Sequence, residues 1–253
     1  MTEHAIDARI DALDVTLFDA IAGQSNAGDR RSWLALQRAV RRRGMPYAYL
    51  EIGSFRGGSM QSFVLDPSCV AIYSVDKRPS VAPDDRGRTV SYAENTTQSM
   101  LERLRRLSPS GAAKVHTFDG TAADIDPGEI TTPPGLCFVD AEHTARAVLV
   151  DVEFVLRVCS PTAVVYFHDD VVVAAAIAGV IRNLRARDIA FQTAKLGGST
   201  FAIGLGNSVL AEPDVKQLSR AGESFLRRQR VKLWLKRHAP APLLRVYWSI
   251  RRR

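Results

Sequence analysis

Five short apolar runs alternate with stretches of helical periodicity through the middle of this chain. The runs are Tyr47–Ile52, Ala71–Val75, Val115–Phe118, Leu136–Val139 and Ala163–Phe167. The stretches between them include the helical patterns Thr97–Leu107 and Ala145–Val158. Strands that alternate with helices in this way predict βα units and a parallel sheet.

Two further apolar runs, Ala190–Lys195 and Thr200–Leu205, are separated by only four residues. So short a connection permits only an antiparallel hairpin. We therefore expect an α/β fold. Its core is a Rossmann-like, doubly wound sheet of seven strands, with five parallel strands and a closing antiparallel hairpin.

Two helical patterns precede this core in the sequence, and a basic segment follows it. Apolar residues recur every three or four positions from Ile6 to Ile21, which predicts one helix there. A second predicted helix, carrying Trp33, ends at Arg43 before Gly44. The expected organisation is a helical preface or lid over 1–46, a main domain over 47–210 and a basic, amphipathic tail over 211–253. The length of 253 residues fits one core with such additions.

The net charge of +7 is distributed unevenly along the chain. Residues 211–253 contain 12 Lys and Arg against 3 Asp and Glu, a net of +9, which leaves a net of −2 for residues 1–210. The overall charge therefore does not indicate the ligand of the main domain. No apolar run reaches the about 20 residues that span a bilayer, and the acidic start lacks a signal peptide's apolar block. We expect a cytoplasmic protein, with peripheral membrane contact as an alternative.

A glycine-rich turn, EIGSFRGGS at residues 51–59, follows the first predicted strand. Ligands of doubly wound sheets bind beyond the carboxyl ends of the strands, and glycine lets the backbone approach them closely. The spacing differs from the GxGxxG of dinucleotide-binding folds, and Glu51 would repel a pyrophosphate placed there. A cationic ligand suits this turn better.

Acidic residues also follow the second and third predicted strands. Asp76 lies 23 residues beyond Gly53, a separation at which a carboxylate can accept both hydroxyls of a ribose. Asp119, followed by Gly120, could accept a hydrogen bond from an adenine amino group. Each aspartate alone could equally be a turn residue.

The order of these motifs resembles the class I S-adenosylmethionine-dependent methyltransferases over about residues 47–206. The resemblance implies that the methionine end of the cofactor lies near Glu51, Gly53 and Ser59, with Ser54 also among the binding residues. It further implies that Asp76 binds the ribose and that Asp119 and Gly120 lie beside the adenine.

Three aspartates and two histidines follow the fourth and fifth predicted strands: Asp140, His143, His168, Asp169 and Asp170. Several carboxylates in one cleft are costly unless a positive charge accompanies them. A hard divalent cation such as Mg²⁺ would satisfy Asp140, Asp169 and Asp170. Alternatively, the acidic pair could cap a predicted helix over 171–184 without any metal.

This pattern is similar to metal-dependent O-methyltransferases of the sugar, macrolide and catechol type. The resemblance implies that the three aspartates hold Mg²⁺ and that the metal binds two adjacent oxygens of the acceptor, a sugar, polysaccharide or other vicinal diol. His143 is then the candidate general base, and Asp140 is the alternative. Strand alternation would turn the His168 side chain away from Asp169, which places it outside the first layer of contacts. A metal-independent methyltransferase and a noncatalytic adenosyl-ligand-binding protein remain as alternatives.

The basic tail admits three interpretations. It could cover the body or a second subunit, as in a homo-oligomer. It could instead lie on an anionic membrane through Trp234, Tyr247 and Trp248, or bind nucleic acid or an acidic glycan. Base-methylating families usually carry Asn or Asp and Pro-Pro-Tyr after the fourth strand, whereas residues 140–143 read DAEH. Modification of nucleic acid is therefore ranked below that of a hydroxyl group.

Overall fold

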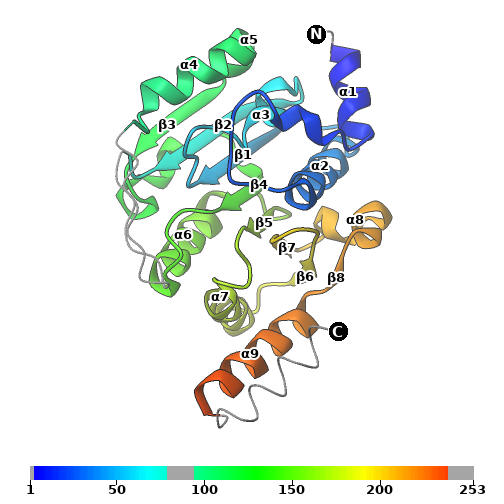
Figure 1. The fold of residues 1–253 in the computed structure, drawn as a ribbon, viewed down its shortest axis with the longest axis vertical. Coiled ribbons are helices and arrows are strands. Elements are labelled where there is room, and N and C mark those ends of the chain that lie inside the picture. Colours follow the sequence, from blue (N-terminus) through cyan, green and yellow to red (C-terminus); the bar gives the residue numbers. More distant parts are fainter. Residues whose placement is uncertain (1–2, 79–93, 239–253) are drawn as a thin grey trace.

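The sheet has the strand order β3-β2-β1-β4-β5-β7-β6-β8 in the computed structural model, which describes residues 3–78 and 94–238 (Figure 1). The strands β1 to β5 run parallel, whereas β7 runs antiparallel to both β5 and β6. Their bounds are β1 (Tyr47–Ile52), β2 (Cys69–Asp76), β3 (Val115–Asp119), β4 (Pro134–Val139), β5 (Val164–Phe167), β6 (Phe191–Lys195), β7 (Phe201–Leu205) and β8 (Arg220–Ala221). The predicted doubly wound sheet with its closing hairpin is confirmed. The additional strand, β8, pairs with β6 over two residues.

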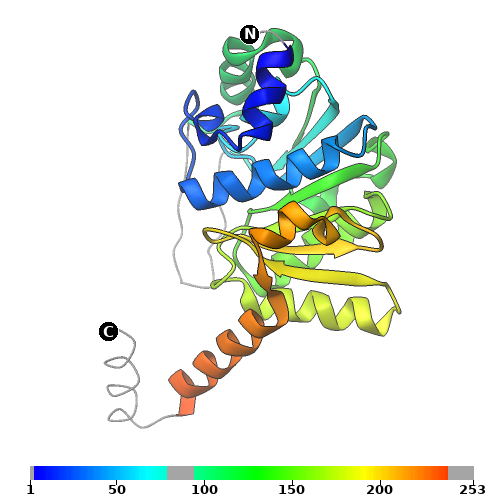
Figure 2. The same cartoon turned by 90° about the vertical axis from the view of Figure 1, so that its right-hand side faces the viewer.

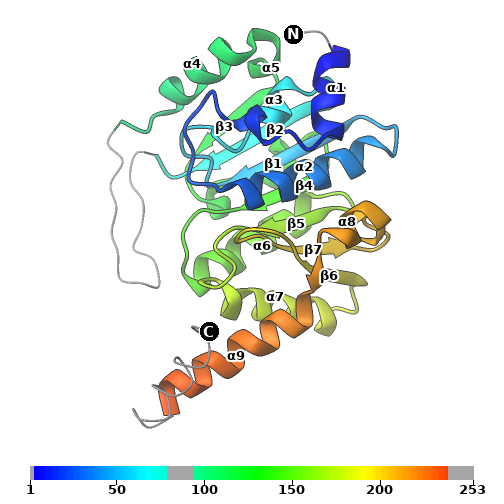
Figure 3. The ribbon, with the colours of Figure 1, turned by 45° about the vertical axis from the view of Figure 1, so that its right-hand side comes forward.

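Helices cover both faces of this sheet (Figure 3). One layer contains α1 (Glu3–Asp11), α2 (Ala27–Arg41), α3 (Gln61–Leu65), α4 (Thr97–Leu107), α5 (Pro109–Ala112) and α8 (Pro213–Gln217). The other contains α6 (Ala145–Val158), α7 (Ala174–Ala186) and α9 (Gly222–His238). Because successive strand residues point to opposite faces, Tyr49 packs in the first layer and Leu50 in the second.

Short 3-10 helices complete the connections: η1 (Val15–Phe18), η2 (Ala122–Asp124), η3 (Pro127–Glu129) and η4 (Val209–Ala211). The first of these corrects the single helix expected over 6–21. The α1 helix ends at Asp11, Leu13 has a φ of +53°, and the Asp14 carboxylate caps η1 by accepting the Thr16 N–H at 3.0 Å. Apolar spacing does not reveal this break, because Ile6 and Ile21 are buried on either side of it.

The α2 helix begins with a capping box between Asn26 and Asp29, in which each side chain accepts the other residue's backbone N–H. The helix ends at Arg41, two residues before the predicted end, and Gly44 follows with a φ of +72°. Eight residues of the helix are buried, among them Trp33 and Asp29. The α2 helix is therefore part of the core and carries a polar side chain into it.

The α7 helix begins at Ala174, later than the expected start at 171. Asp169 has a φ of +48°, and its carbonyl accepts the N–H groups of Val172 and Val173 at 2.7 and 3.2 Å. The residue before the helix is Val173, which makes no side-chain capping hydrogen bond. The alternative that Asp169 and Asp170 cap this helix is therefore wrong.

The α9 helix is anchored near its beginning and then extends away from the body (Figure 2). Phe225 is buried, and its ring centroid lies 5.9 Å from that of Phe201. Farther along, Val231 is 52% exposed. In the described part of the chain, every helix is too short or too polar to reach across a lipid bilayer.

Candidate active site

A cavity of about 820 Å³ opens at the carboxyl ends of β1, β2, β4 and β5. The order of strands reverses between β1 and β4, and a doubly wound sheet leaves a crevice at such a point. Five predicted cofactor-binding residues line the cavity: Gly53, Ser54, Ser59, Asp76 and Gly120. The predicted polar residues Asp140, His143, His168 and Asp169 line it too. The structure thus brings most of the predicted site together.

The turn after β1 needs glycine at position 53. Gly53 has a φ of +98°, and its N–H donates to the Val75 carbonyl at 2.8 Å. A Cβ atom at this position would lie 2.3 Å from the Asp140 carbonyl oxygen. Gly53 therefore allows the β1 turn to approach the end of β4 more closely than any residue with a side chain would.

Glu51 lies at the end of β1 and is fully buried. Its carboxyl accepts hydrogen bonds from the hydroxyls of Ser59 and Tyr49, the latter at 2.9 Å. Burial raises the pKa of Glu51 to about 8, although both hydroxyls oppose that shift. Glu51 does not line the cavity. Ser59, which donates a hydrogen bond to Glu51, does line it.

The two predicted nucleoside-binding aspartates have different surroundings. Asp76 lines the cavity, and its Oδ2 accepts the Phe55 N–H at 2.5 Å. Asp119 turns instead toward Arg78, whose Nη1 lies 2.9 Å from its Oδ1, and toward the Thr97 hydroxyl. Gly120 lies on the cavity wall and Asp119 does not, so the structure does not place the Asp119 carboxylate where the sequence suggested.

Two carboxylates and two imidazoles meet at the ends of β4 and β5. His143 Nε2 lies 3.5 Å from Asp140 Oδ1 and 3.4 Å from Asp169 Oδ2. His168 Nδ1 lies 3.3 Å from Asp140 Oδ1 and 3.9 Å from Asp169 Oδ1. Each histidine is therefore within reach of both aspartates.

His168 contradicts the expectation drawn from strand alternation. That expectation assumed that the strand continues through residue 169, but β5 ends at Phe167 and the chain turns at Asp169, with its positive φ. Burial disfavours the charged imidazole, but Asp140 and Asp29 outweigh it and raise the pKa of His168 to about 11. His168 is therefore a buried cation beside Asp140.

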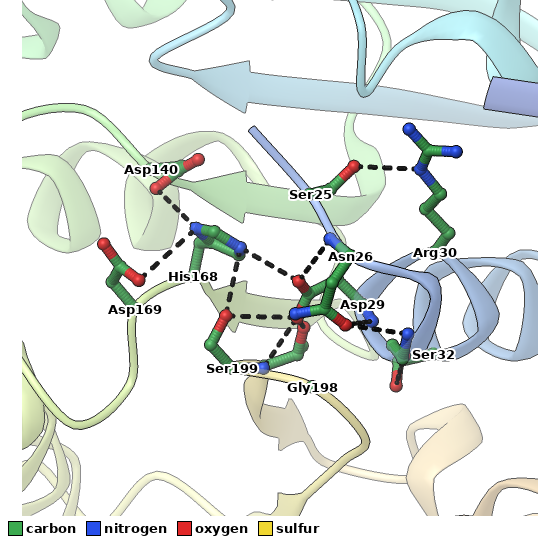
Figure 4. A network of polar contacts seen from close by, with 12 residues as sticks. Ser25, Asn26, Asp29, Arg30, Ser32, Asp140, His168, Asp169, Gly198 and Ser199 are labelled. Carbon is green, nitrogen blue, oxygen red and sulfur yellow. Dashed lines mark hydrogen bonds and ion pairs between the residues drawn. The ribbon is translucent and has the colours of Figure 1, made fainter. Parts of the chain in front are cut away.

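Asp29 is the partner that sequence reasoning missed (Figure 4). Its side chain is fully buried, and its Oδ2 lies 3.3 Å from His168 Nε2. Its Oδ1 accepts the Ser199 N–H at 2.7 Å, and Oδ2 accepts the Asn26 N–H at 3.0 Å. Burial would raise the pKa of Asp29, but the hydrogen bonds from His168, Asn26 and Ser199 lower it to about 2. The capping-box spacing was readable from the sequence, whereas the contact across 139 residues was not.

The predicted set of three metal-binding aspartates is not assembled. Asp170 is 1% exposed, does not line the cavity, and its Oδ2 lies 2.7 Å from Lys195 Nζ. His168 thus provides a positive charge beside Asp140, and Lys195 provides one beside Asp170. Within residues 3–78 and 94–238, no group of three or more His, Cys, Asp and Glu is arranged to hold a metal ion. Asp140 and Asp169 remain as a pair of carboxylates on the cavity wall.

Asp151, on α6, is a second residue that sequence reasoning missed. It lines the cavity, is 5% exposed, and its Oδ2 has no hydrogen-bond partner among the described residues. Burial, with a smaller effect from Glu142, raises the pKa of Asp151 to about 7. No sequence signal distinguishes it from the other polar residues of an amphipathic helix.

Comparison with known proteins agrees with this fold. Residues 50–169 match the family described as "Methyltransferase domain". No curated protein gave a significant match. Solved structures at low identity share the fold, among them cofactor-bound Rv0187 from MTB, with 15% identity and a TM-score of 0.53 over 79% of this chain and 90% of that one.

Two further similar structures are named as O-methyltransferases. One is TomG from Streptomyces achromogenes, involved in tomaymycin synthesis and solved with S-adenosylmethionine, with 16% identity and a TM-score of 0.51 over 79% of this chain and 88% of that one. The other is a Bacillus cereus enzyme with S-adenosylhomocysteine, with 13% identity and a TM-score of 0.50 over 78% and 90%. Residues 50–169 thus match a methyltransferase domain, and the chain shares its fold with solved O-methyltransferases.

Proposed function

We propose that this enzyme transfers the methyl group of S-adenosylmethionine to a hydroxyl of a sugar or other vicinal diol. The observation that carries the proposal is the shared cavity. The glycine turn with Asp76 lies on one part of its wall, and the Asp140, His143, His168 and Asp169 cluster on another. A volume of about 820 Å³ is within the range of pockets that hold molecules of this size. The names of the TomG and Bacillus cereus enzymes support oxygen as the acceptor atom.

The cofactor part of the cavity suits a nucleoside with a cationic amino-acid end. The Oδ2 of Asp76 accepts a hydrogen bond from the Phe55 N–H. Asp76 lines the cavity, where its carboxylate can also accept hydrogen bonds from ribose hydroxyls. Glu51, behind Ser59, would be ionised by a nearby ammonium or sulfonium group, because an opposite charge lowers the pKa of a carboxyl.

The reaction itself requires positioning and the removal of one proton. The acceptor oxygen attacks the methyl carbon in line with the bond to sulfur; the O–CH₃ bond forms, the S–CH₃ bond breaks, and S-adenosylhomocysteine leaves. In our proposal, His143 takes the hydroxyl proton at Nε2, between Asp140 and Asp169. Asp140 is the alternative base. The buried His168 cation offsets the charge of Asp140 throughout.

If Mg²⁺ binds, we propose that two carboxylates hold it rather than three. Asp140 and Asp169 would hold it, because Asp170 is bound to Lys195 and because protein-bound Mg²⁺ commonly uses one or two carboxylates with water. A bound Mg²⁺ would act as a Lewis acid that lowers the pKa of the acceptor hydroxyl.

Calorimetric titration with S-adenosylhomocysteine, with and without Mg²⁺, tests the cofactor assignment directly. We expect binding in both cases, because the metal would serve the acceptor. Release of S-adenosylhomocysteine is then measured with a panel of sugars and catechols, with Mg²⁺ and with EDTA. Failure to bind the nucleoside would refute the methyltransferase site. Activity that EDTA leaves unchanged would remove magnesium, and binding without turnover of any hydroxyl acceptor would favour a noncatalytic role.

A further inference from the structure

A second cavity lies in the groove between α7 and α9, and none of its lining residues lines the active-site cavity. It has a volume of about 510 Å³. Its α9 wall carries residues spaced three or four apart, which share one face of that helix. Its α7 wall is built the same way from small residues around Ala174 and Ala178. Two facing helix stripes therefore enclose the space, and the small side chains on α7 keep it open.

The lining of this α7–α9 groove is strongly basic. It contains four arginines and one glutamate: Arg182, Arg185, Arg227, Arg230 and Glu223. Glu223 pairs with Arg185. Among the residues that the structure describes, no carboxylate lies within ion-pair distance of Arg182, Arg227 or Arg230. Three guanidinium groups from two helices thus share one groove, and no carboxylate of residues 3–78 or 94–238 pairs with them.

Apolar residues accompany this charge. The apolar part of the lining consists of Ala174, Ala175, Ala178, Ile181, Leu226, Leu233 and Trp234. Leu233 is 42% exposed, and Trp234 is 59% exposed on the same stretch of α9. Trp at the edge of an apolar surface is typical of contacts with membrane interfaces, where one side of the ring is apolar and the other is wet.

We propose that the α7–α9 groove binds anionic phospholipid and so holds the enzyme on a negatively charged membrane surface. Guanidinium groups suit phosphate because they donate paired hydrogen bonds to it, and the apolar lining suits the start of the acyl chains. The combination favours lipid over nucleic acid, since a phosphate backbone does not need the apolar half. The chain beyond residue 238 adds Arg245 and Arg251–Arg253 with no acidic residue, which continues the positive charge. Tyr247 and Trp248 lie outside the described residues.

Co-sedimentation of the full chain with vesicles tests the groove. Phosphatidylcholine vesicles with and without phosphatidylglycerol are compared at physiological ionic strength. We expect binding only with phosphatidylglycerol. The double substitution Arg182→Gln and Arg227→Gln should weaken that binding roughly 10- to 30-fold. Each basic residue near an anionic membrane strengthens binding about fivefold.

The matched control removes the same charge elsewhere. Arg105 and Arg106 are exposed near the end of α4, in the opposite helical layer. The pair Arg105→Gln and Arg106→Gln should leave vesicle binding close to wild type. Both double variants should keep wild-type affinity for S-adenosylhomocysteine, which shows that they fold.

Several results would overturn the proposal. Equal losses in the two double variants would mean that net charge alone attracts the chain. Wild-type vesicle binding by the groove variant would assign the contact to another part of the chain. Tighter binding of homopolymeric RNA than of phosphatidylglycerol vesicles, lost in the groove variant, would make the groove a nucleic-acid site. A stable dimer that this variant disrupts would make it a subunit interface.

Discussion

Asp29 connects the N-terminal helix α2 to the polar cluster at the end of β5. Its carboxylate faces His168 on one side and the Ser199 N–H on the other. Asp29→Asn should retain the fold, because an amide fills the same space, but it should release His168 from its position beside Asp140. We expect kcat to fall roughly 10- to 100-fold, the usual effect of small misplacements in an active site, while affinity for S-adenosylhomocysteine stays nearly constant.

Asp19→Asn is the matched control for this measurement. Asp19 pairs with Arg30 at 2.7 Å, but its side chain is 60% exposed. The same chemical change there should leave kcat unaltered. A kcat of Asp29→Asn equal to that of the wild type would show that Asp29 only holds the helix.

Asp151 should make the stability of the protein depend on pH. Its pKa is about 7 in the folded state and about 4 in the unfolded state. Between these values the folded state binds the extra proton, so stability decreases as pH rises from 4 to 7 and is constant beyond. Asp151→Asn removes that penalty. The variant should match the wild type near pH 4 and exceed it by at most about 4 kcal/mol above pH 7, in urea unfolding at each pH. A pH-independent difference would contradict this assignment.

His143 as the general base predicts a specific change in the pH profile. The ascending limb of kcat/KM against pH reports the ionisation of the base in the free enzyme. His143→Ala should remove that limb and lower the rate roughly 100- to 10,000-fold. His116→Ala is the control, because His116 is exposed and stacks on Tyr73 outside the cavity. If His143→Ala keeps the wild-type limb, Asp140 becomes the base.

The turn after β1 illustrates how one element positions another. Gly53→Ala would place a methyl group against the backbone of Asp140, in addition to the strain of a positive φ. Gly44→Ala is its control, because Gly44 also has a positive φ, but no atom lies within 4 Å of the added Cβ. We expect a loss of about 1–2 kcal/mol for Gly44→Ala and a clearly larger one for Gly53→Ala, measured by urea unfolding. Equal losses would show that strain alone matters at Gly53.

Elements with strong local signals were predicted well. The helices α4 and α6 have the predicted bounds, since Thr96 and Thr144 cap them with their hydroxyls and an apolar stripe continues to the end. The break after α1 and the late start of α7 were not predicted, because both depend on positive φ values at Leu13 and Asp169 rather than on composition. The strand β8 depends on pairing with β6 across the hairpin and has no pattern of its own.

At the site, the sequence identified residues that follow strand ends and missed those that arrive from elsewhere. Parallel strands bring Asp76, Asp140 and Asp169 to one edge, so their proximity could be predicted. Asp29 and Asp151 come from helices, and only tertiary packing places Asp151 on the cavity wall and Asp29 beside His168. Asp170 was wrongly grouped with Asp169, because adjacency in sequence does not show that a turn sends Asp170 to Lys195.

At the scale of the whole molecule, our proposal assigns the cofactor and the acceptor to different parts of the cavity, according to the strand order. Asp76, at the end of β2, should serve the nucleoside, whereas Asp169, at the end of β5, should serve the acceptor. Asp76→Ala should weaken S-adenosylhomocysteine binding in calorimetry. Asp169→Ala should abolish turnover and leave that binding nearly intact. Loss of nucleoside affinity in Asp169→Ala would mean that the two halves are not separate.

The burial of Trp33 in the cavity wall, and of Asp29 behind His168, defines the smallest unit that can act as an enzyme. A chain shortened to begin at residue 47 would retain the whole family-matched region, 50–169. It would lose Asp29, whose carboxylate faces His168, and Trp33, whose ring centroid lies 4.9 Å from that of Phe138. It would also lose the helices that cover part of one sheet face. Such a shortened chain would expose apolar sheet to water and aggregate. The folding unit therefore extends beyond the family-matched region, and it includes α2 as well as the sheet.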